Sequence, residues 1–414
     1  GSSNVVGTKV AYIGYEAGYY ATGSYNTFVG SNAGKGGTTS APFSSGQNNT
    51  AVGYQALDAF TTGYENVAIG GGAGGALTTG YTSTFVGYAA GQSVTTAGNN
   101  NYFGYAAGNG TTGGGNVGIG NHVMKNGAGA AADNTAVGGS SLYAITTGTK
   151  NTTLGQSTGE TLTTTSNTVL IGYQAGKAIN SADADGTIAI GYNAGTSITS
   201  GQKNTIIGYN AGDALTDGDA STIVGYEAGT ALAVTGARGS TLVGHEAGKA
   251  LTQGGNNTAI GRGALKTQTT GNSNVAIGDQ AMQYTPASTA ITSVVAIGPS
   301  ALGDGSGMST TGNGSVAIGN AAGNNVKNLA GEFVIIGNNA GQKINGTGVT
   351  HIGYQAGTFA TGSNNTFVGT EAGYGGATSA PFSSGVNNTA VGYQALTAFT
   401  TAEDNTALGM YAGR

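Results

Sequence analysis

The chain repeats one short hydrophobic pattern along its length. An apolar residue stands directly before a glycine in each copy, as Val29 before Gly30 and Ile69 before Gly70, and this glycine serves as the anchor of the copy. The sequence holds 23 anchors, most often 17 residues apart. A fixed period of this length is typical of solenoids, in which short units stack and bury the apolar faces of their neighbours. Positions are counted from the anchor, so that Val29 is at position −1.

The three residues before the anchor predict a strand. Position −3 is Thr or Val in most copies and position −1 is always apolar, and alternate residues of a strand share one face. Position −2 points to the other face and is Ala or a larger apolar residue such as Phe28 in most copies. A strand with one face in water should alternate polar and apolar residues. We therefore expect both faces to be buried, one of them against another chain, and the residue at −3 to point inward.

A second short strand is expected around position +7, where an apolar residue such as Leu77 recurs. This residue often lies in a sequence such as Ala-Leu-Thr-Thr-Gly, which indicates a strand that runs into a turn. Ala at +3, followed in most copies by Gly, indicates a tight corner between the strands. The predicted fold is all-β: a parallel β-solenoid, or β-roll, of about 23 rungs of about 17 residues with two short strands per rung.

Position −4 is occupied by asparagine in most copies. Stacked amides can hydrogen bond from rung to rung, as in cross-β ladders, and Asn also suits turns. Asn-x-Thr triplets in this column match the glycosylation pattern, but a ladder accounts for the column as a whole. We predict a structural ladder that includes Asn26, Asn49, Asn66, Asn134, Asn151, Asn204, Asn257, Asn274, Asn365, Asn388 and Asn405.

Composition narrows the function classes. Only 7% of the residues are charged, the net charge is −5, and no basic stripe exists, which argues against nucleic acid as a partner. No apolar run is long enough to span a membrane. The absence of cysteine excludes disulfides and thiolate metal sites. The 81 glycines and the abundant Val, Ile, Thr and Tyr agree with a strand-rich repeat protein.

A larger repeat contains the small ones. Residues 14–61 match residues 353–400 at 38 of 48 positions, and the two segments lie 339 residues apart. Both ends of the chain consist of ordinary rung sequence, whereas the terminal rungs of a solenoid normally carry caps. We therefore expect residues 1–414 to form a single repetitive solenoid that is an uncapped segment of a longer fibre.

Several copies resemble known repeats. The text NVAIG at Asn66–Gly70 and Asn274–Gly278, and SVAIG at Ser315–Gly319, resembles the head-type β-roll repeats of trimeric autotransporter adhesins. NNTAVGYQAL, which occurs twice, resembles the Gly-rich repeats of phage tail fibres and large bacterial surface proteins. The resemblance implies a homotrimeric fibre on a cell surface or virion, with the V-x-I side chains inside each roll. The period is longer than that of the usual adhesin rung. A triple-wound β-prism, in which three chains share each rung, stays an alternative.

Residues that could carry catalysis are few and dispersed. His122, His245 and His351 stand at different positions on distant rungs, which does not match the spacing of a metal site. Glu227 and Glu246 share position +2 on adjacent rungs, but other copies hold Gln or Asn there. This is typical of a polar surface stripe and not of a catalytic carboxylate pair. We expect no catalytic residue, no metal and no cofactor, and hence no enzyme.

Aromatic residues are the better candidates for contacts. Tyr follows the anchor directly in ten copies, and on stacked rungs such rings would lie over one another, either at a seam between chains or as a platform for sugars. The insertion SAPFSSG, which occurs twice, is expected to protrude. The candidate contacts with a partner or glycan are Tyr173, Tyr192, Tyr209, Tyr226, Pro42, Phe43, Pro381 and Phe382.

The expected function is that of a structural extracellular fibre or adhesin-like shaft. Its partners would be copies of itself, side by side as a homotrimer or other homo-oligomer and end to end along the fibre, and surface polysaccharide. Two alternatives stay open. A carbohydrate-active tailspike would need a groove with converging acids. An ice-binding solenoid would need a flat, regular, outward array of threonines, and here the threonines at −3 are expected to point inward.

Overall fold

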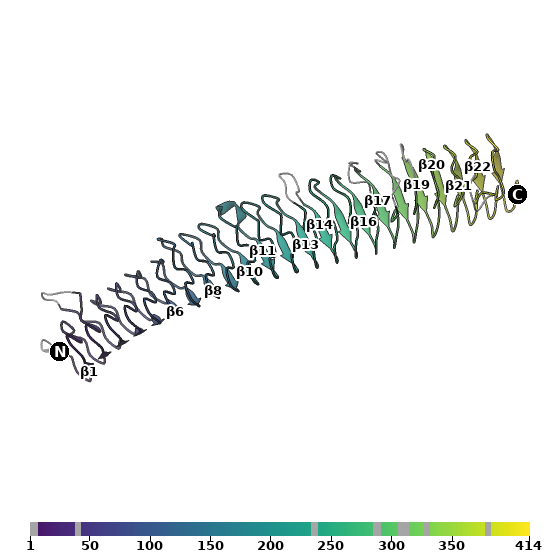
Figure 1. The fold of residues 1–414 in the computed structure, drawn as a ribbon. Coiled ribbons are helices and arrows are strands. Elements are labelled where there is room, and N and C mark those ends of the chain that lie inside the picture. The colour runs from purple at the N-terminus through teal and green to yellow at the C-terminus, as the bar shows by residue number, and fades with distance from the viewer. Residues whose placement is uncertain are drawn as a thin grey trace. The chain divides into compact units, whose positions relative to one another are not determined.

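The computed structural model describes residues 7–37, 43–232, 239–284, 291–304, 314–326, 332–376 and 382–414. In this part the chain winds as a parallel β-solenoid with one strand of three or four residues in each turn (Figure 1). The predicted solenoid fold is thereby confirmed. The chain divides into two compact units, Gly1–Lys203 and Asn204–Arg414, and each is described by itself.

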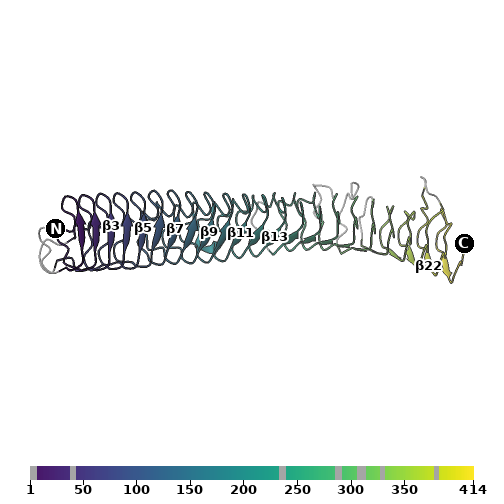
Figure 2. The ribbon, with the colours of Figure 1, turned by 90° about the horizontal axis from the view of Figure 1, so that it is seen from below.

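The first unit carries eleven strands among its described residues, and they lie side by side along one side of the coil (Figure 2). One short 3-10 helix, η1 (Ala182–Ala184), interrupts the turn before the last of them. The strands are β1 (Ala11–Ile13), β2 (Thr27–Val29), β3 (Thr50–Val52), β4 (Val67–Ile69), β5 (Thr84–Val86), β6 (Asn101–Phe103), β7 (Val117–Ile119), β8 (Thr135–Val137), β9 (Thr152–Leu154), β10 (Val169–Ile171) and β11 (Ile188–Ile190).

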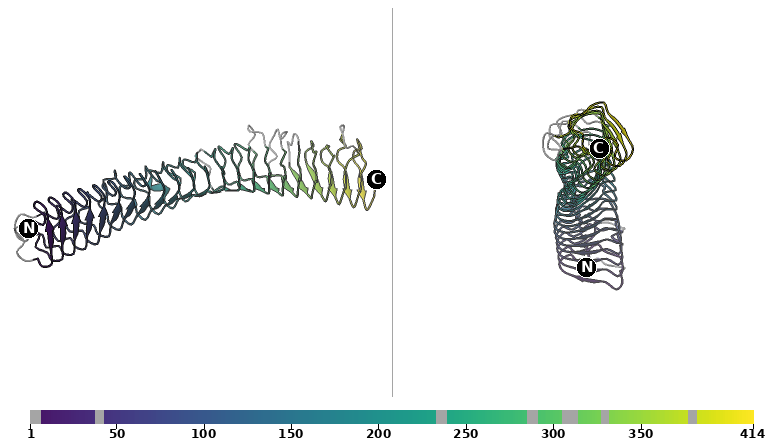
Figure 3. Two further views of the ribbon diagram at one scale, coloured as in Figure 1. Left: turned by 60° about the horizontal axis from the view of Figure 1, so that its bottom comes forward. Right: turned by 90° about the vertical axis from the view of Figure 1, so that its right-hand side faces the viewer.

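The second unit carries twelve strands in the described ranges, again with one strand per turn (Figure 3). The strands are β12 (Thr205–Ile207), β13 (Thr222–Val224), β14 (Thr241–Val243), β15 (Thr258–Ile260), β16 (Val275–Ile277), β17 (Val295–Ile297), β18 (Val316–Ile318), β19 (Phe333–Ile336), β20 (Val349–Ile352), β21 (Thr366–Val368), β22 (Thr389–Val391) and β23 (Thr406–Leu408).

Within each unit the strands pair in parallel and in register with the sequence repeat. Thr27 of β2 pairs with Thr50 of β3, and Phe28 pairs with Ala51, so equivalent positions stack on each other. Insertions between anchors do not shift this register. The pair β2–β3 spans the first SAPFSSG insertion and keeps the same alignment as pairs separated by the usual 17 residues.

The second predicted strand is wrong. The residue at +7 is buried, as in Phe60 and Leu77, but it does not belong to a strand in the described residues. The segment around it forms turns and a few isolated bridges, such as Ala21 with Ser44 and Thr111 with Gly129. Glycines around this segment let the backbone turn, so it supplies a core side chain to each rung without forming a second sheet.

The predicted orientation of the strand residues is also wrong. The middle residue at −2 points into the coil and is fully buried in most rungs, as in Phe28 and Ala68. The residues at −3 and −1 point outward, and Ile69 and Ile119 are 42% and 43% exposed. The V-x-I side chains therefore lie outside the coil and not inside it. In the single chain, only one face of the strand is buried.

Large and small residues compensate inside each coil. Where position −2 is large, position +4 on the same rung is glycine, because a Cβ on Gly34 would lie 2.5 Å from the ring of Phe28 and one on Gly91 would lie 2.3 Å from the ring of Phe85. Several rungs with Ala at −2 instead place a leucine or methionine at +4, as Leu57 does opposite Ala51. This exchange keeps the core volume filled, which close packing requires.

The anchor glycine is required by the stacking itself. Its φ lies between +117° and +142° in the 23 anchors, a region that L-residues with side chains avoid. A Cβ on Gly30 would lie 2.5 Å from the carbonyl oxygen of Gly53, and one on Gly225 would lie 2.3 Å from that of Gly244. Both the backbone conformation and the contact with the next rung therefore exclude any other residue.

The asparagines at −4 bond from rung to rung. The Nδ2 atom of Asn66 donates to the Oδ1 atom of Asn49 at 3.0 Å and to the carbonyl oxygen of Gly80 at 3.0 Å. Its own Oδ1 atom accepts from the backbone N–H of Ser83 at 3.0 Å. The same arrangement recurs in other rungs, with amide-to-amide bonds from Asn151 to Asn134, Asn388 to Asn365 and Asn405 to Asn388. The side chains at Asn26, Asn204, Asn257 and Asn274 bond to neighbouring backbone groups.

We expect the substitution Asn66→Ala to lower the free energy of unfolding by about 2–5 kcal/mol, because it leaves several buried polar groups without a partner. The measurement is chemical denaturation followed by circular dichroism. The matched control is Asn121→Ala, an exposed asparagine at position +1, for which a change within about 0.5 kcal/mol is expected. Equal effects of the two substitutions would contradict the structural role of the ladder.

Candidate functional site

The outward residues of the strands form a continuous surface in each unit. This strand face consists of positions −3 and −1 and carries no charged residue in any described strand. Position −3 is Thr or Val in most rungs, and position −1 is Val, Ile, Leu or Phe. The most exposed −1 residues are Ile13 on the first strand, at 64%, and Leu408 on the last, at 77%, and away from these end strands Leu154 reaches 50%. The face is therefore uncharged, and its −1 column is apolar and in contact with solvent in the single chain.

Tyrosines at +1 stack beside the strand face. The ring centroids of Tyr173 and Tyr192 lie 5.1 Å apart with an interplanar angle of 17°, in the first unit. Those of Tyr209 and Tyr226 lie 5.3 Å apart at 8°, in the second unit. All four rings are between 39% and 47% exposed. The structure thus brings the predicted tyrosines into stacked pairs on the surface.

Stacking limits what these rings can bind. Each ring covers a face of its neighbour, so a stacked pair presents mainly ring edges and hydroxyl groups to solvent. A sugar usually packs its C–H groups against an aromatic face. Such contacts are therefore available only at the ends of a stack or where the column is interrupted. His245 extends the stack of Tyr226, with ring centroids 5.1 Å apart.

The two Pro-Phe insertions are only partly described. Pro42 and Pro381 lie outside the described residues, whereas Phe43 and Phe382 lie within them. Phe43 stacks on Tyr20 with centroids 6.2 Å apart, and Phe382 stacks on Phe359 with centroids 5.9 Å apart. Each insertion therefore places an aromatic ring next to another aromatic ring of the coil.

Phe382 also lines a surface hollow of about 340 Å³. The Nζ atom of Lys343 lies 4.9 Å from the centroid of the Phe382 ring, a cation–π contact. The other lining residues are Asn325, Asn345 and Thr361. Sequence reasoning selected Phe382 but not these four, because they come from three different rungs and no periodic signal connects them.

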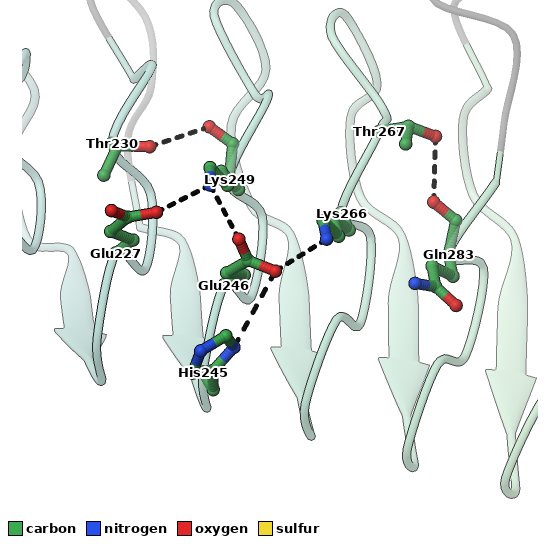
Figure 4. A network of polar contacts seen from close by, with 8 residues as sticks. All are labelled: Glu227, Thr230, His245, Glu246, Lys249, Lys266, Thr267 and Gln283. Carbon is green, nitrogen blue, oxygen red and sulfur yellow. Dashed lines mark hydrogen bonds and ion pairs between the residues drawn. The ribbon is translucent and has the colours of Figure 1, made fainter.

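A charged network crosses three rungs of the second unit (Figure 4). The Nζ atom of Lys249 lies 2.6 Å from Glu227 and 2.6 Å from Glu246. The second carboxylate oxygen of Glu246 lies 2.6 Å from the Nζ atom of Lys266. The Nδ1 atom of His245 lies 3.7 Å from the same oxygen. Glu227 and Glu246 are thus close to each other, as their shared column predicts, but lysine separates their charges.

This network holds Glu246 as a carboxylate. The hydrogen bonds from Lys249 and Lys266 lower the pKa of Glu246 to about 2. The hydrogen bonds from Glu227 and Glu246 raise the pKa of Lys249. A general acid or base works best with a pKa near the working pH, so these groups suit fixed ion pairs between rungs. Because the lysines are about a third exposed, solvent weakens each pair.

His351 has a different environment from the other histidines. It occupies position −2 on β20, so it points into the core, where it is fully buried and stacks on Phe367 with ring centroids 4.9 Å apart. Neither ring nitrogen has a hydrogen-bond partner. Burial lowers the pKa of His351 from its ordinary value of 6.5 to about 3. The alignment on the anchor contains this signal, because position −2 is otherwise almost always apolar.

The described ranges contain no group of three or more His, Cys, Asp or Glu side chains that could hold a metal ion. The same ranges contain no helix with the length and apolar character needed to cross a bilayer. No protein-family model matches the chain, and no curated protein matches it.

We expect acid to destabilise the rungs around His351. The folded state keeps this imidazole neutral down to about pH 3, whereas the unfolded chain binds a proton below about pH 6.5. Stability therefore falls as the pH drops from about 6.5 towards 3. The substitution His351→Phe should remove this part of the pH dependence of the melting temperature.

The matched control is Ile335→Val in the neighbouring rung of the same core column. It should destabilise the protein by about 0.5–1.5 kcal/mol, by an amount that does not change with pH. A pH dependence that is identical in the wild type and His351→Phe would contradict the proposed burial of a neutral imidazole.

Proposed function

We propose that this chain is a non-enzymatic segment of a structural extracellular fibre, an adhesin-like shaft on a cell or virion. The proposal includes assembly with further copies of the same chain through the strand face, as a homotrimer or another homo-oligomer. It also includes contact of the aromatic surface with polysaccharide. The observation that carries the proposal is the uncharged, apolar strand face on each unit.

The extent of this face supports an assembly function. Monomeric soluble proteins rarely expose a contiguous apolar patch of more than a few hundred Å². In the first unit alone, eleven successive rungs contribute an outward apolar residue at −1. Burial of apolar area stabilises a contact by roughly 25 cal/mol per Å², so a face that recurs on every rung would hold copies together along their length.

The polar surface supports a structural function. Three of the four glutamates at +2 are engaged in ion pairs with lysine, as Glu16 is with Lys35 at 2.6 Å, and the fourth, Glu371, accepts a hydrogen bond from Gln394. The pKa of Glu16 is lowered by the hydrogen bond from that lysine. Such pairs join one rung to the next and hold the carboxylates at +2 in ion pairs with lysine, whereas glycoside hydrolysis uses a carboxyl group with a raised pKa opposite a free carboxylate.

Ice binding is the second candidate, and one observation favours it. The threonines at −3 point outward and not inward, so the objection drawn from the sequence no longer holds. Five strands of the first unit and eight of the second carry this threonine. Their hydroxyl groups repeat at the roughly 4.8 Å spacing of adjacent strands, on a face without charge, where an ordered layer of water could form.

Native mass spectrometry of the purified chain tests the assembly. We expect the wild type to form a homo-oligomer and the double variant Ile69→Lys, Ile119→Lys to be monomeric, because each lysine would place a charge in an apolar interface. Both side chains are solvent-exposed in the single chain, so the fold should persist. The control is Asn121→Lys, Gln156→Lys, which adds the same charge at exposed turn positions.

A monomeric wild type, or an oligomer unaffected by the lysines in the strand face, would contradict the proposed assembly. Measuring thermal hysteresis in solutions of the wild type and the strand-face variant distinguishes ice binding from the fibre function. A monomeric wild type that depresses the freezing point, and a strand-face variant that does not, would favour ice binding over the fibre.

A further inference from the structure

The tyrosine column of the first unit has a gap at one rung. Tyr54 and Tyr88 occupy position +1 on the rungs of β3 and β5, but the rung of β4 between them has Gly71 at this position. Adjacent strands lie roughly 4.8 Å apart, so the planes of two rings separated by one rung lie roughly 10 Å apart. One ring-shaped group fits between them at ordinary stacking distance.

The exposure of the two tyrosines agrees with an open slot. Tyr54 and Tyr88 are 59% and 62% exposed, compared with 51% for Tyr105, which has an aromatic ring on each side. Tyr88 stacks on Tyr105 on one side only, and Tyr54 has no ring contact among the described residues. Each therefore has an aromatic face that no other ring covers, and the ring of Tyr88 lies next to Gly71, 3.4 Å from the position that a Cβ would take there.

The same rung lacks side chains at two further outward positions. Gly72 at +2 and Gly75 at +5 line a hollow of about 370 Å³, and Gly72 directly follows Gly71 of the slot. The neighbouring rungs place polar side chains around it: Gln55 and Asp58 on one side and Gln92 on the other. The glycines of a single rung thus create both the slot and the hollow.

Asp58 gives this hollow an unused acceptor. Its Oδ1 atom is buried and has no hydrogen-bond partner. Burial raises the pKa of Asp58, and the charge of Lys35 acts in the opposite direction. A buried carboxylate oxygen without a partner costs free energy unless a ligand or water supplies the donor.

We propose that the notch formed by Tyr54, Gly71 and Tyr88 binds one neutral pyranose ring of a polysaccharide, with hydroxyl groups bonded to Gln55, Asp58 and Gln92. The two aromatic faces fit the C–H faces of a sugar ring. The amides and the carboxylate, which lie to one side, fit its rim of hydroxyl groups. An aromatic side chain of a protein partner would fill the slot but would leave the acceptor of Asp58 unused.

This inference rests on the adhesive part of the proposed function and names a site for it, whereas the assembly of the fibre does not depend on it. It also explains why the stacked tyrosine pairs elsewhere need not bind sugar, since their faces cover one another. The equivalent Tyr393 of the large repeat has Met410 on the following rung, so it lacks the glycine gap.

The test is binding of the full chain to an array of neutral oligosaccharides of glucose, galactose, mannose and N-acetylglucosamine, followed by titration calorimetry with the best ligand. The decisive variant is Gly71→Tyr, which places the usual residue of the column in the slot. A Cβ at Gly71 would lie 3.4 Å from Tyr88, an ordinary contact, so the variant should fold. The matched control is Gly139→Tyr, the same substitution at +1 of another rung, where the nearest atom is 3.8 Å from the Cβ.

We expect the wild type and Gly139→Tyr to bind alike, and Gly71→Tyr and Asp58→Ala each to weaken binding by about tenfold or more. No binding by the wild type, or undiminished binding by Gly71→Tyr, would overturn the proposal. If Gly71→Tyr does not fold, Asp58→Ala and Tyr88→Ala test the proposal in its place, because weakened sugar binding is expected for both and undiminished binding would overturn the proposal. A protein that forms oligomers but binds no sugar would refute this site while leaving the assembly intact.

Discussion

The close approach of anchor glycines on successive rungs is the constraint on which this structure depends. Each anchor adopts a φ that side chains disfavour, and its Cα faces the carbonyl group of the next anchor, as Gly30 faces Gly53. No other residue fits there, so the chain must return to the same backbone geometry at every turn. Insertions such as the one after Gly37 are accepted because they fall between anchors, and β2 and β3 on either side of it keep the usual register.

This constraint separates the inside of the coil from the outside. A strand of three residues directly before the anchor has one inward side chain, and the exchange of large and small residues between −2 and +4 fills the narrow core. Asparagine amides satisfy the buried backbone groups where each strand begins, as Asn66 does for Ser83. The outer positions are then free to vary, and both the apolar strand face and the glycine gap at Gly71 lie on this outer surface.

The repeat made the solenoid and its register predictable, because a period of 17 residues with an invariant glycine admits few other folds. The sequence pattern did not predict which face of the strand points into the core. Thr and Val at −3 and −1 suit both a core and an interface between chains. The prediction of a second strand around +7 was wrong, because burial of a residue such as Leu77 indicates a contact with the core but not hydrogen-bonded strand pairing. The hollows at Phe382 and Gly72 depend on neighbours from several rungs, which a single column does not show.

Disulfide formation between paired cysteines tests the register of stacked rungs most directly, because the chain contains no cysteine of its own. Thr222 and Thr241 are direct partners on β13 and β14, and adjacent strands lie roughly 4.8 Å apart, within the span of a disulfide. Thr222 and Thr258 are two strands apart, beyond that span. We expect the double variant Thr222→Cys, Thr241→Cys to form an intramolecular disulfide on oxidation, and Thr222→Cys, Thr258→Cys to stay reduced. The reverse result, or equal cross-linking of both pairs, would contradict the stacking in register.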